Sequence, residues 1–197
     1  MNTFKLIGFL ALTAIMGLAF TGPTTILKVN PSLSTITWTG YKVTGSHTGT
    51  IGVKEGGLEY TDDALTGGSF TIDMTSIVST DLAGSGMENK LEGHLKSPDF
   101  FGVETYPTAK FEITKVISRG QEGDYKIKGN LTIKETTKEI RFKTSIVEKD
   151  GAKVATTKVT IDRSDFDVRY GSGSFFDNLG DKTIYDEFDL EIKLVVE

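Results

Sequence analysis

Apolar and polar residues alternate along most of the chain after about residue 25. The clearest case is at the C-terminal end, where Phe188, Leu190 and Ile192 fall on one face and charged residues fall on the other. A period of two predicts a strand with one buried face and excludes a helix. The same pattern, enriched in threonine and β-branched residues, recurs at residues 35–43, 69–74, 110–116, 125–133, 139–146 and 157–163, with a further strand-like piece at 166–170.

Glycine-rich turn signals separate these stretches. They lie at residues 55–57, 66–68, 120–123 and 149–151, and the adjacent Asp62 and Asp63 also resemble a turn. About eight strands at this spacing predict a sandwich or a closed barrel. Closure is favoured because it leaves no strand edge exposed. We therefore predict a single all-β domain over residues 25–197, an antiparallel eight-stranded barrel.

One segment departs from the alternation. Met87, Leu91 and Leu95 are four residues apart, Ser85 to Glu88 match a capping box, and Pro98 follows. This spacing predicts one short helix over about residues 85–97. We expect the helix to lie across an opening or a side of the barrel.

The first 22 residues have the layout of a secretory signal. A lysine at position 5 precedes the uncharged run 6–20, and small residues follow it. A spanning helix needs about 20 apolar residues, and this run is shorter, although an uncleaved membrane anchor is the alternative. No cysteine follows the run, which excludes a lipid-modified cysteine anchor. We expect residues 1–22 to be a signal peptide and the mature protein to be periplasmic or secreted.

Composition excludes several classes of function. The chain has no Cys, so it has no disulfide, thiolate nucleophile or cysteine metal site. It has two His, which is too few for a three-His metal centre, and a net charge of −5, which argues against nucleic-acid binding. Residues 171–174 match no phosphate-binding loop and predict a surface loop. No Ser lies in a G-x-S-x-G sequence. We expect no catalytic residue, no metal site and no cofactor.

The aromatic content is more informative. The chain has twelve Phe, and those after the signal segment either fill the barrel interior or line a tunnel. The period of two does not distinguish a packed wall from a lined cavity, so both remain open. Arg163 and Arg169 flank Phe166; either arginine is suited to a phosphate or carbonyl head group at a barrel mouth. Pairing with Asp162, Asp165 or Asp167 on the surface is the slightly favoured alternative.

Four strings in order resemble the YceI-like family. They are LEGHLKSPDFFGVETYP with the following Phe111, GNLTIK at 129–134, TKEI at 137–140, and IDRSDFDVRYG from residue 161. The resemblance spans about residues 28–197. It implies an extended, lipocalin-like barrel in an exported bacterial protein, with a long isoprenoid chain, such as a polyprenyl phosphate or a quinone tail, inside it. It also implies that His94, Leu95, Phe100 and Phe101 lie beside the cavity, and it matches Arg163, Phe166 and Tyr170 to motif positions.

These arguments together give a candidate ligand-binding set. It comprises Trp38, Ile72, Met74, Leu91, His94, Leu95, Phe100, Phe101, Phe111, Phe142, Arg163, Phe166, Tyr170, Phe188 and Leu190.

Three functions remain open. The first is a carrier or store for an isoprenoid or related amphiphile, which needs no catalytic residue. The second is an enzyme acting on such a lipid, with His94 or an arginine as the polar group. The third is an interaction protein built on a packed barrel. We favour the carrier, with transient membrane contact and a homodimer as further partner hypotheses.

Overall fold

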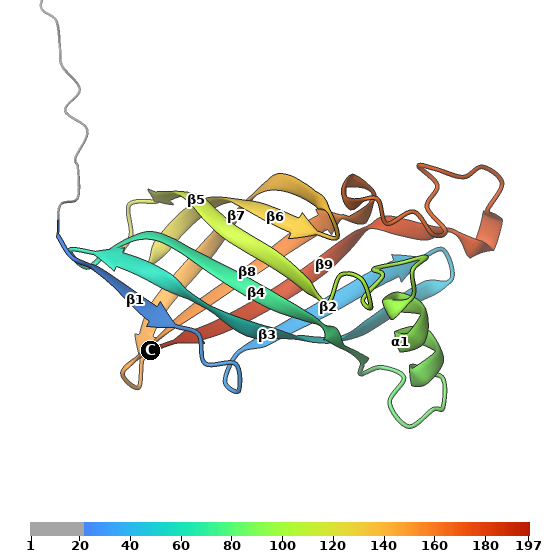
Figure 1. Ribbon diagram of the computed structural model, residues 1–197, viewed down its shortest axis with the longest axis horizontal. Coiled ribbons are helices and arrows are strands. Elements are labelled where there is room, and N and C mark those ends of the chain that lie inside the picture. Colours follow the sequence, from blue (N-terminus) through green and yellow to red (C-terminus); the bar gives the residue numbers. More distant parts are fainter. Residues whose placement is uncertain (1–21) are drawn as a thin grey trace, which may run out of the picture.

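The computed structural model describes residues 22–197, which form a barrel with a short helix at one end (Figure 1). The nine strands of this part are β1 (Thr24–Lys28), β2 (Thr35–Lys42), β3 (Gly45–Thr61), β4 (Ala64–Ser79), β5 (Thr108–Ser118), β6 (Asp124–Ile133), β7 (Thr136–Lys149), β8 (Ala152–Asp162) and β9 (Ile184–Val196). The helices are α1 (Glu88–Lys96) and the 3₁₀ helices η1 (Arg163–Phe166) and η2 (Gly180–Lys182). The predicted signal peptide lies almost wholly outside the described residues.

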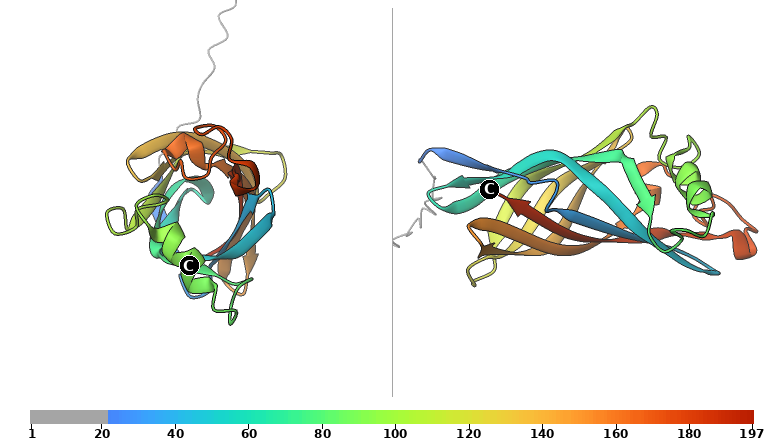
Figure 2. Two further views of the ribbon diagram at one scale, coloured as in Figure 1. Left: turned by 90° about the vertical axis from the view of Figure 1, so that its right-hand side faces the viewer. Right: turned by 90° about the horizontal axis from the view of Figure 1, so that it is seen from below.

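The strands close into a ring of eight. Neighbouring strands pair antiparallel from β2 through β9, and β9 pairs back onto β2. Strand β1 pairs with residues 57–61 of β3, while β2 pairs with residues 45–51 of the same strand. The two short strands β1 and β2 therefore pair with different parts of the same edge of β3. For this reason β1 does not add a ninth strand to the ring. The predicted all-β, antiparallel, eight-stranded barrel with one helix is confirmed, and the ring is visible end-on in Figure 2.

Turn chemistry explains how consecutive strands reverse. Asp62 and Asp63 both have positive φ, 50° and 61°, between β3 and β4, as a two-residue hairpin turn requires. The predicted turns at 120–123 and 149–151 also separate strands, β5 from β6 and β7 from β8.

Two predicted turns are wrong. Residues 55–57 lie inside β3 and residues 66–68 lie inside β4. Their glycines serve close approach between strands: a Cβ on Gly56 would lie 2.3 Å from the Ser69 carbonyl oxygen. A Cβ on Gly68 would likewise lie 2.6 Å from the Gly57 carbonyl oxygen. The ladder also shifts register between Val53 and Glu55, so this part of the wall is bulged rather than turned.

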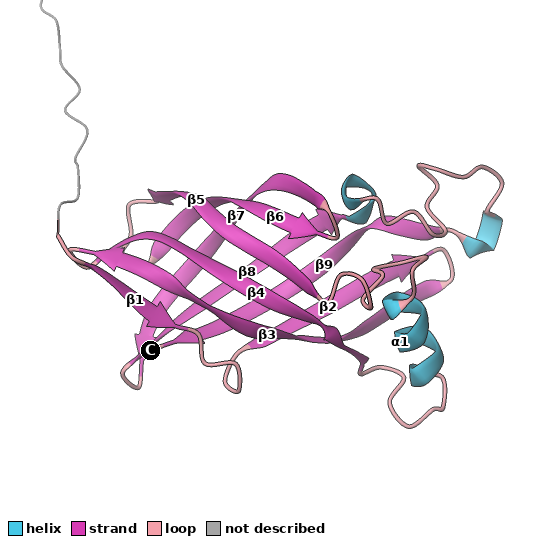
Figure 3. Cartoon of the chain, in the orientation of Figure 1, coloured by secondary structure: helices cyan, strands magenta, loops and turns pink. Residues whose placement is uncertain are grey.

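Two element boundaries also differ from the prediction. Helix α1 begins at Glu88, whereas the prediction began it at about residue 85. Its N-cap residue is Met87, which makes no side-chain capping bond. Ser85 instead donates to the Leu82 carbonyl and accepts from the Met87 N–H. Residues 166–170 are not a strand: Phe166 ends η1, and Asp167 follows in the left-handed conformation. Figure 3 shows η1 as a short helical turn after β8.

None of the helices in residues 22–197 has the length and apolar character needed to span a bilayer.

Candidate ligand-binding site

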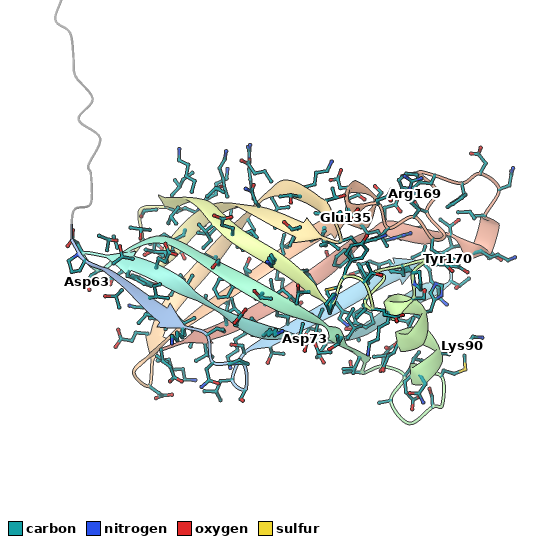
Figure 4. The ribbon with its side chains drawn as sticks, viewed as in Figure 1. Asp63, Asp73, Lys90, Glu135, Arg169 and Tyr170 are labelled. Atoms are coloured by element: carbon teal, nitrogen blue, oxygen red, sulfur yellow. The ribbon has the colours of Figure 1, made fainter. Side chains whose placement is uncertain are left out.

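An apolar cavity of about 230 Å³ runs inside the barrel. Its lining comes from all eight strands of the ring and from α1. Toward the end where β3 turns into β4 it is bounded by Leu58 and Leu65, and toward the α1 end by Leu95 and Phe100. Asp63 marks the first of these ends, and Lys90 and Tyr170 mark the second, in Figure 4.

The accessibility of the inward side chains shows that the barrel is hollow. On β9, Phe188, Leu190, Ile192 and Leu194 line the cavity, yet all four are only half-buried. Phe142 on β7 behaves in the same way. In a close-packed interior such side chains would have almost no accessible surface. The question that periodicity leaves open is therefore decided in favour of a lined cavity.

Most of the predicted ligand-binding residues line this cavity. They are Trp38, Ile72, Met74, Leu95, Phe100, Phe101, Phe111, Phe142, Arg163, Phe188 and Leu190. Alternation placed the strand residues correctly, because successive side chains on a strand point to opposite faces. Whether they contact a ligand stays a prediction.

Four predicted residues do not line the cavity. Leu91, on α1, is half-buried and is absent from the lining. Phe166 is 1% exposed and packs in the hydrophobic cluster around Met74, Ile161 and Val103. Tyr170 is 47% exposed on the loop after η1.

His94 is the fourth. Its ring packs edge-on against Tyr170, with ring centroids 4.3 Å apart, and against Phe100, at 5.7 Å. Its Nε2 atom is buried and has no hydrogen-bond partner among the described residues. His94 therefore supports the aromatic cluster behind Phe100 without lining the cavity itself.

Arg163 is buried, not a surface residue. Its side chain is 3% exposed. The guanidinium donates from Nη1 to the Val168 carbonyl at 2.6 Å, from Nε to the Tyr185 carbonyl at 3.1 Å and from Nη2 to the Ile184 carbonyl at 2.9 Å. Nη2 also lies 3.2 Å from Asp186 Oδ1.

The favoured surface pairing of Arg163 is therefore wrong, because η1 turns the side chain inward toward the start of β9. Burial lowers the pKa of the guanidinium, and the charges of Asp186 and Asp162 oppose that shift. Arg169 does make the surface pairing, with Asp167. Since most of the Arg163 donors are engaged by the protein, its main role is to hold the β9 segment in place.

The candidate set omits many lining residues. They include Ile36, Ile51, Phe70, Ile77, Ile113, Ile127, Leu131, Ile133, Ile140, Ile146, Val159, Ile161, Ile192 and Leu194. Nearly all of them sit at alternating positions of the strands, so the period of two is the signal that identifies them. Ile77 is the exception, because it lies three residues after Met74, where the β3–β4 ladder shifts register.

The site offers burial rather than reactive chemistry. Its lining is aliphatic and aromatic, with Arg163, two threonines and two tyrosines as the polar members. Within residues 22–197 no three His, Cys, Asp or Glu side chains are grouped so as to hold a metal ion. The arrangement suits a long apolar ligand enclosed along the barrel axis.

Solved structures share this architecture. BcnA of Burkholderia cenocepacia aligns with a TM-score of 0.68 at 20% identity, over 86% of this chain and 99% of that one. A polyisoprenoid-binding domain from Saccharophagus degradans gives 0.65 at 13% identity, over 88% and 99%. The Campylobacter jejuni YCEI protein gives 0.52 at 18%, over 100% and 93%. At these identities the likeness shows a common fold.

Sequence comparison identifies the family. A UPF0312 protein of Pseudomonas aeruginosa is 43% identical over 54 residues, and this stretch spans 27% of each protein. The family model described as YceI-like domain matches residues 27–196, which is nearly all of the described barrel. This chain therefore belongs to the YceI-like domain family.

Proposed function

We propose that the protein encloses the tail of a long isoprenoid or similar amphiphile in its barrel and serves as an exported carrier or store. The observation that carries this proposal is the apolar cavity lined by all eight strands. The Saccharophagus degradans neighbour, whose name states polyisoprenoid binding, supports the same ligand class. The sequence of residues 1–22 supports export.

The cavity has an energetic consequence. An empty cavity costs roughly 24 cal/mol per Å³, so a volume of about 230 Å³ corresponds to about 5–6 kcal/mol. A domain's whole stability is about 5–15 kcal/mol. An apolar occupant removes this cost, because each buried CH₂ contributes about 0.8 kcal/mol. The occupied barrel is therefore the stable form.

Reversible binding follows from the alternative location of the ligand. A long isoprenoid tail is already sheltered from water when it lies in a membrane. Transfer into the barrel exchanges one apolar environment for another and also orders a flexible chain. The net free energy is then small, which suits pick-up and delivery.

A cavity also bears on the alternatives. A packed barrel that acts only as a scaffold would have interlocked inward side chains, whereas those of β9 are half-buried around a void. For an enzyme the polar group proposed from the sequence was His94 or an arginine; His94 lies outside the lining, and Arg163 is engaged by backbone carbonyls. Binding without catalysis is the function that this geometry supports best.

A plug in the middle of the barrel tests the proposal. Val159 lines the cavity and pairs with Leu190 across β8 and β9. We expect Val159→Trp to fill the space and to reduce the lipid that co-purifies with the protein at least tenfold. The readout is organic extraction followed by mass spectrometry, with circular dichroism to verify the fold.

Thr156→Trp is the matched control, since Thr156 lies on the same strand, is exposed and is absent from the lining. It should retain the lipid of the unmodified protein. Equal lipid content in the unmodified protein and Val159→Trp, or no lipid in either, would contradict the proposal.

A further inference from the structure

The barrel wall is interrupted where β2 meets β9. Gly40 pairs with Phe188 and Lys42 pairs with Ile184, so the single residue Tyr41 stands opposite residues 185–187. Two extra residues on β9 form a bulge, and a bulge leaves backbone groups outside the regular ladder. The seam between the first and the last strand of the ring is therefore irregular on the α1 side.

A polar cleft lies outside this bulge and adjoins the cavity. The cleft is lined by Tyr41, Ile184 and Tyr185, which also line the cavity, and by polar residues of β8, β9 and the loop between them. Among the cavity-lining residues that the structure describes, Tyr185 alone is exposed, at 51%. At Tyr185 the lining of the cavity therefore reaches the exposed surface.

Arg163 keeps the bulge in shape. Its Nε and Nη2 atoms donate to the carbonyl groups of Tyr185, the first residue of the bulge, and of Ile184, which pairs with Lys42 just before it. The bulge is thus held in place by side-chain hydrogen bonds and does not depend on fraying of a strand end.

The cleft carries negative charge. Asp186, Glu187 and Asp189 line it, and among the described residues its lining includes no lysine or arginine. Hydrogen bonds from Thr160 and Tyr41 lower the pKa of Asp189, which keeps this carboxylate ionised at neutral pH. Arg163, behind the cleft, pairs with Asp186, and the charge of Lys158, which is itself paired with Glu191, also lowers the pKa of Asp189.

The cleft offers hydrogen-bond acceptors. Asp186 Oδ2 accepts from Ser174 Oγ at 2.6 Å, and the buried Oδ1 lies 3.2 Å from Arg163 Nη2. Glu187 lines the cleft beside it and is exposed. Because each carboxylate oxygen can accept more than one hydrogen bond, a hydroxyl donor on a bound molecule would find acceptors here.

We infer that the gap opposite Tyr41 is a lateral portal in which the polar end of the enclosed lipid lies, and that this end is an uncharged hydrogen-bond donor such as an alcohol, not a phosphate. The inference rests on the proposed lipid-binding function and adds the position and the chemistry of the head group. A phosphate here would face the carboxylates of Glu187 and Asp189, while Arg163 is already paired with Asp186, and like charges repel.

Two lipids with the same tail test the head-group selection. Trp38 is the only tryptophan and lines the cavity, so its fluorescence reports occupancy. Titration with a polyprenol and with the polyprenyl monophosphate of equal length should give an affinity at least tenfold higher for the alcohol. Equal or tighter binding of the phosphate would overturn the inference while leaving lipid binding intact; binding of neither lipid would overturn both.

Reversing a charge in the cleft tests whether the cleft determines the preference for the alcohol over the phosphate. Glu187→Lys should reduce the preference for the alcohol at least threefold by improving phosphate binding. Glu148→Lys, at the far end of β7 and outside both the cleft and the cavity, should leave the preference unchanged. An unchanged preference in Glu187→Lys would overturn the assignment of this cleft.

Blocking the gap tests the portal. Because the chain has no Cys, Tyr185→Cys provides a single thiol for a bulky maleimide. The labelled protein should take up polyprenol from vesicles at least tenfold more slowly, measured by Trp38 fluorescence. Phe176→Cys, exposed on the neighbouring loop but absent from the cavity lining, is the control. Equal uptake by the two labelled proteins would overturn the portal.

Discussion

At the scale of single residues, Arg163 illustrates how a buried charge is stabilised. The guanidinium loses its hydration on burial but gains three backbone carbonyls, the carboxylate of Asp186 and the face of Phe100, whose ring centroid is 5.2 Å away. Removing one member of such a network leaves the other groups buried without partners. Arg163 thus joins η1, the loop after it and the start of β9.

Arg163→Met should lower the free energy of unfolding by about 3–5 kcal/mol, because Asp186 and three carbonyls lose their donor. For a chain of this size that corresponds to a fall in Tm of about 10 °C or more. Differential scanning calorimetry measures it.

Arg169→Met is the matched control, since Arg169 is exposed and pairs only at the surface; its cost should stay below about 1 kcal/mol. Similar Tm values for the two variants would show that the Arg163 network does not stabilise the fold.

Residue-level prediction from sequence succeeded where position on a strand decided the outcome. Phe188 and Leu190 follow the period of two and line the cavity. It did not predict the positions of Phe166 and Tyr170, since a 3₁₀ turn replaces the expected strand and neither side chain lines the cavity. The Asp186 partner of Arg163 was also missed, since 23 positions separate the two in sequence and only the turn of the chain brings them together.

At the scale of elements, the glycine pairs were the main source of error. A Gly-Gly pair between apolar runs has the composition of a turn. In β3 and β4 the same composition lets the two strands approach closely. At Gly56 and Gly68 the backbone of the neighbouring strand occupies the space that a Cβ atom would need. Composition alone cannot separate these roles, because both follow from the missing side chain. Helix α1 was predicted correctly as a helix, but its first turn was not, since Ser85 bonds locally instead of capping.

The segment that leads from β4 to α1 is held by Asp81. Asp81 Oδ2 lies 2.8 Å from His47 Nδ1. Asp81 Oδ1 accepts hydrogen bonds from Ser79 Oγ, at the end of β4, and from the Thr48 N–H of β3. Burial on its own raises the pKa of Asp81, but the hydrogen bonds from His47, Ser79 and Thr48 outweigh it and lower the pKa below its ordinary value of 3.8.

Asp81→Ala should therefore lower stability at neutral pH by about 1–3 kcal/mol. Because the folded pKa is depressed, this contribution is present above about pH 4 and is lost as the pH falls through the folded pKa. Urea unfolding at several pH values should show the two proteins converging in acid.

Asp177→Ala, in the exposed loop before β9, should show no such convergence. A stability difference for Asp81→Ala that is the same at neutral and acid pH would contradict the assigned role of the carboxylate.

At the scale of the whole molecule, the architecture was predictable and the hollow was not. Alternation over about eight strands fixes an all-β closed structure because edges must be paired. The same alternation describes a barrel with a solid core and one with a tunnel. The difference lies in how far opposite walls stand apart, which depends on strand number and stagger together. The extra β1, sharing one side of β3 with β2, was not anticipated either.

The chemistry of the interior follows from this shape. With inward side chains of ordinary size on a wall of eight strands, space remains along the axis, and its lining is almost entirely apolar. Such a space is unfavourable for water, which needs polar partners. An apolar chain is the occupant that the lining accepts.

The most direct measurement is a crystal structure of the protein purified without added ligand. We expect continuous elongated electron density along the axis, in contact with Trp38, Phe142 and Leu190, that protein atoms do not explain. Density for the protein side chains alone, with those three residues moved inward to touch one another, would show that the barrel closes on itself and would contradict the account.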